Sequence, residues 1–228
     1  MRGIEFLLSG VCHQWASHSL IYEGVPLPLC ARCSGTFVGA MLTLITLWLL
    51  GEGRRSELPS WRRAAPLIVL VLAWAVDGLN SLLYTWGVWW LYTPSNTLRL
   101  ITGTGTGLAV GAVLYPAAHY ALWRDTRQEP VLAERSHALA VMGVAGAFVL
   151  LSLTWTAAPR WLVWPLHVGS VGVLFTLVNA LLVALLMHGR GVARHAREMA
   201  PYLGIGLIAG VVEMGAMALL RTLIERLA

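Results

Sequence analysis

Residues 30–50 read CARCSGTFVGAMLTLITLWLL, in which a pair of cysteines stands directly before an uncharged apolar run. A helix crosses the hydrocarbon core of a bilayer with about 20 mostly apolar residues, so this stretch predicts a membrane-spanning helix over 34–50. Five further runs of the same kind occupy 64–85, 100–123, 138–157, 161–187 and 201–220. We therefore predict an all-α integral membrane protein with six transmembrane helices.

The composition of the chain favours the same class of protein. Apolar residues make up 57% of its 228 residues and charged residues only 12%, about half the charged fraction of a typical soluble domain. The formal charge of +5 comes from 16 basic residues, all of them Arg, against 11 acidic ones. These arginines are spread over several loops, whereas a nucleic-acid site needs them on one face. We expect the lipid bilayer as surroundings and no nucleic-acid partner.

The distribution of arginine predicts how the chain is oriented. The loops after the first, third and fifth spans are rich in Arg, and the other two loops hold only Arg160. Loops rich in basic residues stay on the cytoplasmic side of a membrane. The pattern predicts a protein of the cell membrane (inner or plasma membrane) with both termini on the extracytoplasmic side.

The loops are too short to fold alone, so residues 1–228 are expected to form a single membrane domain. Within it, residues 1–33 form an N-terminal cap, 34–123 a core of three spans, and 138–220 three further spans. Glycines at short spacing in spans three and six predict close helix packing of the small-residue kind; they are Gly103, Gly105, Gly107, Gly204, Gly206 and Gly210.

The cap carries all three cysteines of the chain. Apolar residues at helical spacing from Ile4 to Trp15 predict a short amphipathic helix in the outer membrane interface. Three sulfurs and one imidazole form the ligand set of many structural zinc sites. We predict a site for Zn²⁺ or a similar ion, formed by Cys12, Cys30, Cys33 and one imidazole.

The fourth ligand of this site depends on where the N-terminal helix ends. Adjacent side chains in a helix point about 100° apart, so Cys12 and His13 can both ligate only if the helix ends there. If the helix continues, His18 is the better fourth ligand.

Other interpretations of the cysteines stay open. Cys30 and Cys33 could exchange with Cys12 in a thiol–disulfide relay coupled to a membrane quinone, or two of the three could form a structural disulfide on an oxidising outer face. In either case the protein could also be a non-catalytic accessory subunit that binds another membrane protein, or it could form a homo-oligomer. Motifs of common hydrolases and nucleotide-binding enzymes are absent from the sequence, and the sequence leaves open whether the protein is an enzyme.

A second set of polar residues is predicted to lie beneath the cysteines, at the outer ends of spans two and three. Ionisable groups at such depth face the bundle interior and pair, so we expect an ion pair between Asp77 and Arg99. The set forms either a polar pocket for a substrate or metal, or a contact that fixes helix register. Its members are Asp77, Asn80, Asn96, Arg99 and Thr102.

Two ionisable residues lie apart from these groups. Glu213, in the middle of span six, needs a partner or a proton to be tolerated there. His167 lies toward the outer end of span five, where it could serve as a ligand, a proton carrier or a hydrogen-bonded residue of the bundle.

With these motifs in view, the chain resembles the predicted multipass membrane protein family catalogued as domain of unknown function twenty eighty-five. The resemblance covers the first half of the chain, and His18 and Ser34 stand where the family pattern has Arg and Thr. It implies that these residues belong to one site, and it names no reaction. The residues that carry it are Cys12-His13-Gln14, Pro28-Leu29-Cys30-Ala31-Arg32-Cys33-Ser34-Gly35, Asp77-Gly78 and Arg99-Leu100-Ile101-Thr102-Gly103.

Overall fold

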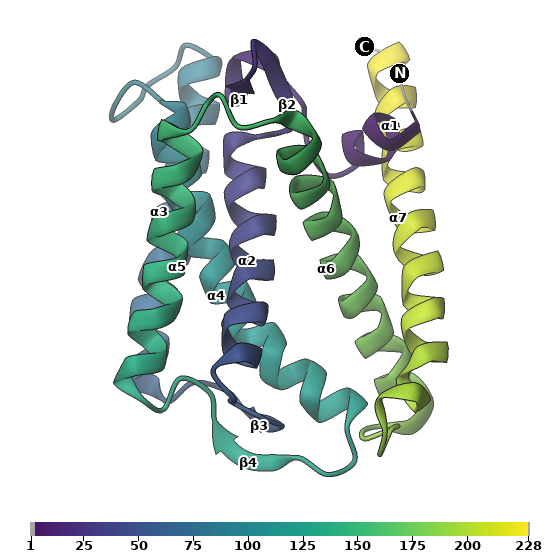
Figure 1. The fold of residues 1–228 in the computed structure, drawn as a ribbon. Helices are drawn as coiled ribbons and strands as arrows, with labels where there is room; N and C mark the ends of the chain where they lie inside the picture. The colour runs from purple at the N-terminus through teal and green to yellow at the C-terminus, as the bar shows by residue number, and fades with distance from the viewer. Residues whose placement is uncertain (1–2, 228) are drawn as a thin grey trace.

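The computed structural model of the chain describes residues 3–227. Six helices in this part of the chain are long and apolar enough to cross a membrane, and they run side by side as one bundle (Figure 1). This confirms the predicted fold class and the six spans, so the protein is integral to the membrane. The helices are α2 (Ala31–Leu49), α3 (Trp61–Thr85), α4 (Asn96–Leu122), α5 (Arg135–Thr154), α6 (Arg160–His188) and α7 (Ala200–Leu227).

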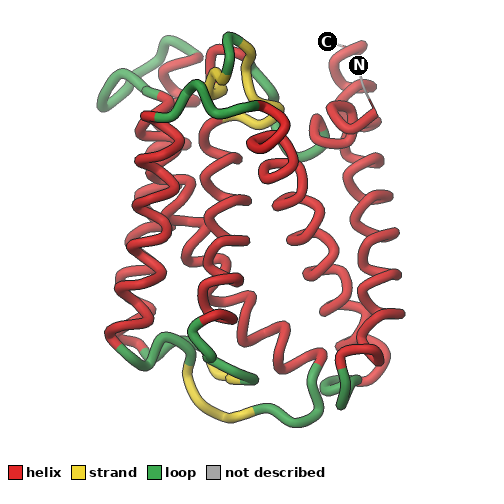
Figure 2. The backbone as a smooth tube through the Cα atoms, viewed as in Figure 1, coloured by secondary structure: helices red, strands yellow, loops and turns green. Residues whose placement is uncertain are grey.

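Short elements cover both ends of the bundle (Figure 2). The end that holds both termini carries α1 (Gly3–Ser9), the 3₁₀ turn η1 (Ala16–His18) and the strands β1 (Ser19–Tyr22) and β2 (Val25–Cys30). The opposite end carries β3 (Arg55–Glu57), β4 (Arg127–Pro130) and a second 3₁₀ turn, η2 (Ala196–Met199). Strands β3 and β4 pair in parallel and join two of the Arg-rich loops.

The lipid-facing surface follows from the pattern of exposure. Many large apolar side chains stay exposed on the outer helices, such as Val69 on α3, Leu150 on α5 and Ile208 on α7. Exposed apolar patches of this extent mark a membrane or partner surface, and the helices that carry them are long enough to span lipid.

The centre of the bundle is the contact between α2 and α4, and glycines allow it. A Cβ atom added at Gly107 would lie 2.5 Å from the Thr36 carbonyl oxygen and 2.8 Å from the Ala40 amide nitrogen. Only a residue without a side chain lets the two backbones approach so closely. Gly206 contacts α6 in the same way, whereas Gly204 has open space around it, so the glycine prediction is confirmed for part of the set.

The N-terminal cap begins with the predicted short helix. That helix, α1, ends at Ser9, so Val11 and Trp15 lie beyond it although their spacing is helical. Gly10 follows, packed so closely on α7 that a Cβ would meet the backbone of Met214 and Ala218. The close contact with α7 therefore directs the chain out of the helix just before Cys12.

A β-hairpin that the sequence analysis did not predict connects the cap to the first span. Strands β1 and β2 are antiparallel, and Tyr22 pairs with Val25 across a two-residue turn. Both turn residues have positive φ, 48° at Glu23 and 75° at Gly24, as a tight hairpin of the type I′ class requires. The hairpin ends at Cys30, which is also the N-cap residue of α2.

Candidate metal centre

Three elements bring the cysteines together. Cys12 follows the turn after α1, Cys30 ends β2, and Cys33 lies in the first turn of α2. Their three Sγ atoms lie within 4.8 Å of one another, and all three cysteines are free of disulfide bonds. The prediction that the three sulfurs meet at the start of the first span agrees with this geometry.

Backbone amides point at two of the sulfurs. The Cys30 amide donates to Cys12 Sγ at 3.2 Å, and the Cys33 amide donates to Cys30 Sγ at 3.5 Å. Hydrogen bonds from Cys30 and Cys33 hold the pKa of the Cys12 thiol far below its ordinary value, whereas the Cys12 neighbour raises the pKa of Cys30 to about 11. These hydrogen bonds stabilise negative charge on Cys12 Sγ.

The cluster is enclosed by apolar side chains from four elements. Cys12 is 5% exposed and Cys30 2%, and they pack with Leu8 of α1, Val171 of α6 and Met214 of α7. A dry shell strengthens the attraction between a cation and thiolates. It also means that the cap, α2, α6 and α7 all meet at this one point.

Arg221 of α7 holds the segment that carries Cys12, a role that the sequence analysis missed. Its Nη1 donates to the carbonyls of Ser9 and Cys12 at 3.1 and 2.9 Å, and its Nη2 donates to that of His13 at 3.2 Å. Its Nε pairs with Glu225 at 2.7 Å. The signal was weak in the sequence because Arg221 is about 210 residues from its partners.

Gln14 fixes the same segment from the other side and was also missed. Its side-chain amide donates to the carbonyls of Glu5 and Pro28, both at 3.1 Å. Gln14 has a φ of 53°, a conformation uncommon for residues other than glycine. The third residue of the Cys12-His13-Gln14 motif is thus a structural link between α1 and β2.

The two candidate imidazole ligands lie beside each other at the edge of the cluster. His13 Nε2 and His18 Nδ1 are 2.9 Å apart, and Trp15 packs against both rings. Burial lowers the pKa of both, that of His18 to about 4, so both are neutral near pH 7. The group of mutually close ligand atoms contains the three sulfurs and neither imidazole, so a histidine would have to turn to complete a tetrahedral set.

An open pocket of about 430 Å³ reaches the cysteine cluster from the end of the bundle. Cys12, His13, Arg221 and Glu225 are among the residues that line it. A metal site needs an entry path of this kind. The pocket gives water and ions a route to the Cys12 side of the cluster.

Asp77 forms its ion pair with Arg32, and the predicted pair with Arg99 is wrong. Arg32 Nη2 lies 2.5 Å from Asp77 Oδ2, and Arg32 Nε lies 3.2 Å from the same oxygen. Arg32 stands between Cys30 and Cys33 in the first turn of α2, where its side chain reaches α3. Arg32 belongs to the cysteine motif in the sequence, but its long side chain extends away from the sulfurs to Asp77 and Ser81.

Other polar residues at the cysteine end of the bundle hold the loops there. Tyr92 donates to Asp77 Oδ1 at 2.9 Å, and Thr102 lies 3.4 Å from Asp77 Oδ2. The Asn80 side chain accepts from the Leu91 amide at 2.7 Å and donates to the Tyr92 carbonyl at 2.9 Å. This connected group, Arg32–Asp77–Tyr92 with Thr102, is called the acidic network below.

Asn96 and Arg99 face the hairpin side of the same end. Asn96 donates to the carbonyls of Ser17 and Ser19 at 3.0 and 3.2 Å. Arg99 donates to Asn96 Oδ1 at 2.8 Å. Arg99 therefore supports the turn before β1 through Asn96.

Glu213 and His167 have partners within the bundle. Asn179 of α6 donates to Glu213 Oε2 at 3.1 Å, so an amide supplies the contact that the sequence analysis could not identify. His167 is 2% exposed, and its Nδ1 lies 2.8 Å from the Val163 carbonyl oxygen. Neither residue belongs to the cysteine cluster.

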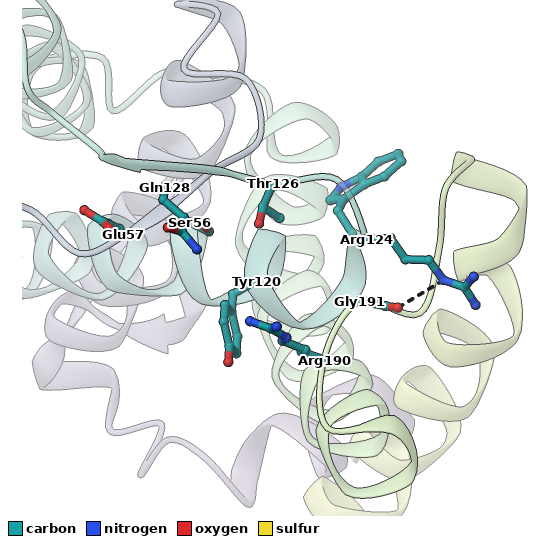
Figure 3. Close-up of a pocket in the computed structure, with 9 residues that line it drawn as sticks. Ser56, Glu57, Tyr120, Arg124, Thr126, Gln128, Arg190 and Gly191 are labelled. Atoms are coloured by element: carbon teal, nitrogen blue, oxygen red, sulfur yellow. Dashed lines mark hydrogen bonds between the residues drawn. The ribbon is translucent and has the colours of Figure 1, made fainter.

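A larger polar pocket, of about 560 Å³, lies at the opposite end of the bundle (Figure 3). Arg124 and Arg190 line it together with Tyr120, and Arg124 Nε donates to the Gly191 carbonyl at 3.2 Å. None of the residues predicted for the site lines this pocket. The cysteine cluster and this pocket are separate features at opposite ends of the helices.

Part of the chain matches a known protein family. Residues 12–113 match the model of a family described as "Predicted membrane protein (DUF2085)", which confirms the resemblance found in the motifs. The matched region begins at Cys12 and ends within α4, so α5, α6 and α7 lie outside it.

A similar protein is known from an archaeon. The chain is 29% identical over 107 residues to an uncharacterized protein of Methanocaldococcus jannaschii, a match that covers 46% of this chain and 62% of the relative. The match thus spans less than two thirds of the relative's length. No solved structure matches the chain.

Proposed function

We propose that Cys12, Cys30 and Cys33 bind a zinc ion that fastens the N-terminal cap to α2 at the surface of the membrane. The observation that supports this most directly is the convergence of three disulfide-free sulfurs within 4.8 Å. Zinc–sulfur bonds of about 2.3 Å in a tetrahedral site require only a small contraction of this cluster. The protein is then a membrane protein whose outer end is stabilised by a metal.

The arrangement around the sulfurs is suited to thiolate ligands. Two amides already point at Cys12 Sγ and Cys30 Sγ, and hydrogen bonds from outside the coordination sphere orient ligands and stabilise their charge. Arg221 places a guanidinium on the backbone next to Cys12. These contacts offset the negative charge that three thiolates and one Zn²⁺ would leave.

The fourth ligand is proposed to be His13 or a water molecule. His13 follows Cys12 directly, α1 has already ended, and the pocket lined by both residues leaves room for the ring to turn. His18 is the alternative imidazole, and a turn of either ring gives up the contact between the two histidines. A water ligand would leave an open coordination position, as catalytic zinc sites have.

The acidic network is proposed to position the first turn of α2, which carries Cys33. Arg32 binds Asp77 and Ser81 on α3, and Tyr92 and Thr102 add contacts from the next two segments. In this role Asp77, Asn80, Asn96, Arg99 and Thr102 form a structural floor beneath the cysteines and bind no substrate.

We propose that the cysteine end of the bundle faces away from the cytoplasm. The Arg-rich loops gather at the other end, with β3 and β4, and the positive-inside rule favours that end for the cytoplasm. A membrane-impermeant thiol reagent should label Val88→Cys in intact cells and Gln128→Cys only after lysis. The reverse labelling pattern would invert the orientation.

Metal analysis tests the proposed zinc site. Protein purified without chelator should carry about one zinc per chain. Mass spectrometry should find all three thiols in the reduced state. Cys30→Ser should lose the metal, and Ser34→Ala, a buried change one residue from Cys33, should keep it. His13→Ala should lower zinc affinity if the imidazole is the fourth ligand and leave it unchanged if water is.

The same experiment separates zinc binding from the rival functions. Absence of metal with a reducible bridge between Cys30 and Cys33 would favour the thiol–disulfide relay and refute the zinc proposal. Absence of metal with three reduced thiols would also refute it. Co-purification of a second membrane protein with zinc-loaded chain would identify an accessory role without contradicting the site.

A further inference from the structure

An apolar cavity of about 490 Å³ opens between α5 and α6, beside the β-hairpin. Aromatic side chains from three segments line it, namely Tyr22 of β1, Phe148 of α5 and Trp155 of the loop that follows. Leu151 and Leu162 also line the cavity, and each exposes about half of its surface. In a membrane these exposed leucines contact lipid, so the cavity is open to molecules dissolved in the bilayer.

His167 of α6 lines this cavity and has one unsatisfied nitrogen. Its side chain is almost wholly buried, at 2% exposed. Its Nδ1 lies 2.8 Å from the Val163 carbonyl oxygen, while its Nε2 is itself buried and has no hydrogen-bond partner among residues 3–227. A buried polar atom without a partner costs about 1–3 kcal/mol, so such an atom calls for a ligand or a bound water.

The contact at Nδ1 determines what Nε2 can bind. A carbonyl oxygen only accepts, so Nδ1 must carry the proton that is shared with Val163. An imidazolium at this depth, with no carboxylate beside it, would be costly to bury. The ring is therefore neutral, and its Nε2 carries a lone pair that accepts a hydrogen bond.

One polar group of the aromatic wall, the Tyr22 hydroxyl, is already occupied. The Tyr22 hydroxyl donates to the Ser152 carbonyl at 2.9 Å. The cavity therefore combines flat aromatic and aliphatic walls with a buried acceptor that requires a donor. A molecule that fits has an apolar body, an aromatic ring and a hydroxyl group.

We propose that this cavity binds a lipid-soluble phenol or quinol whose ring hydroxyl displaces the side chains that cover His167 Nε2 and donates to that nitrogen. Apolar pockets with one or two well-placed polar groups are the usual form of small-molecule sites. The ring lies against Phe148 and Trp155, and the alkyl tail leaves toward lipid past Leu151 and Leu162. The proposal is independent of the metal at the cysteines.

Binding of two matched probes tests the proposal. Radiolabelled 4-octylphenol and its methyl ether, 4-octylanisole, have the same ring and tail, and only the phenol can donate. Equilibrium binding to the full chain in nanodiscs, with empty nanodiscs subtracted, should favour the phenol by about tenfold, the value of one hydrogen bond to a buried acceptor. Equal binding of the two probes to the unmodified protein would by itself overturn the proposal.

Variants of two histidines provide the controls. His167→Phe keeps a ring but removes the acceptor and should abolish the preference for the phenol, while His167→Gln should restore part of it through the amide oxygen. His119 of α4 makes the same contact with the carbonyl four residues before it, 2.8 Å from Tyr115, so His119→Phe should leave the preference unchanged. Loss of the preference in His119→Phe, or its survival in His167→Phe, would also refute the assignment.

Discussion

The ion pair between Arg32 and Asp77 gives a prediction that separates the observed structure from the pairing expected from the sequence. Asp77→Asn keeps the shape of the side chain and removes its charge. The Asp77 side chain is 1% exposed and that of Arg32 18%, so the change leaves a guanidinium largely out of water. Removing one partner of a buried pair costs about 3–5 kcal/mol.

The expected loss lies at the lower end of that range. Arg32 keeps some contact with solvent and two other acceptors, the Asp77 carbonyl at 3.1 Å and the Ser81 hydroxyl at 3.0 Å. An Asn side chain can still accept the Tyr92 hydroxyl. We therefore expect the free energy of unfolding to fall by about 3 kcal/mol.

Unfolding by SDS in mixed micelles, followed by circular dichroism, measures this loss. Asp125→Asn, at an exposed position with no ion pair among the described residues, is the matched control and should change stability by less than about 0.5 kcal/mol. A double-mutant cycle between Asp77→Asn and Arg32→Met should give a coupling of at least about 1 kcal/mol. If Asp77→Asn instead showed this coupling energy with Arg99→Met and none with Arg32→Met, the observed pairing would be refuted.

Three further predictions concern other contacts of the fold. In metal-free protein, Arg221→Met should raise the rate at which thiol reagents label Cys12 by at least about tenfold, because three carbonyl contacts of the segment are lost. An unchanged labelling rate would contradict the role of Arg221. Gly107→Ala should lower the thermal midpoint by an amount equivalent to about 2 kcal/mol because its Cβ meets α2 backbone, while Gly143→Ala, with open space around it, should leave the midpoint equal or slightly higher. Glu52→Gln should cost about 3 kcal/mol in SDS unfolding, since the carboxylate is 0% exposed and contacts Arg55 at 2.6 Å and His137 at 2.5 Å; a neutral result would show that those contacts do not form in the membrane.

The candidate site shows where reasoning from the sequence succeeds and where it fails. The Cys30-x-x-Cys33 spacing predicts neighbouring sulfurs, because residues three apart at a helix start share a face. That Cys12 joins them followed from its residue type and its place near the same span. The histidines stay a prediction as ligands, and their contact with each other and with Trp15 depends on the turn of η1.

The errors have a common physical cause. Arg32 reaches Asp77 because a long flexible side chain can leave the segment that carries it, and the sequence gives no direction for that reach. Arg221 and Gln14 bind backbone carbonyls, which every residue has, so no pattern of residue types marks their partners. The β-hairpin was missed because its two strands are short and β2 contains two prolines, although Glu23-Gly24 is a recognisable turn pair.

The amino-acid sequence by itself determined that this chain spans a membrane six times, because lipid requires each backbone polar group to be satisfied within its own helix and so demands long apolar segments that can be counted. It also placed the cysteines at the start of the first span. Only the tertiary structure decided which charge meets which, that α7 returns to hold the Cys12 segment, and that His167 Nε2 is left without a partner beside a cavity. Those contacts join residues far apart in the chain, and they depend on the distances and angles between helices, which residue order alone does not specify.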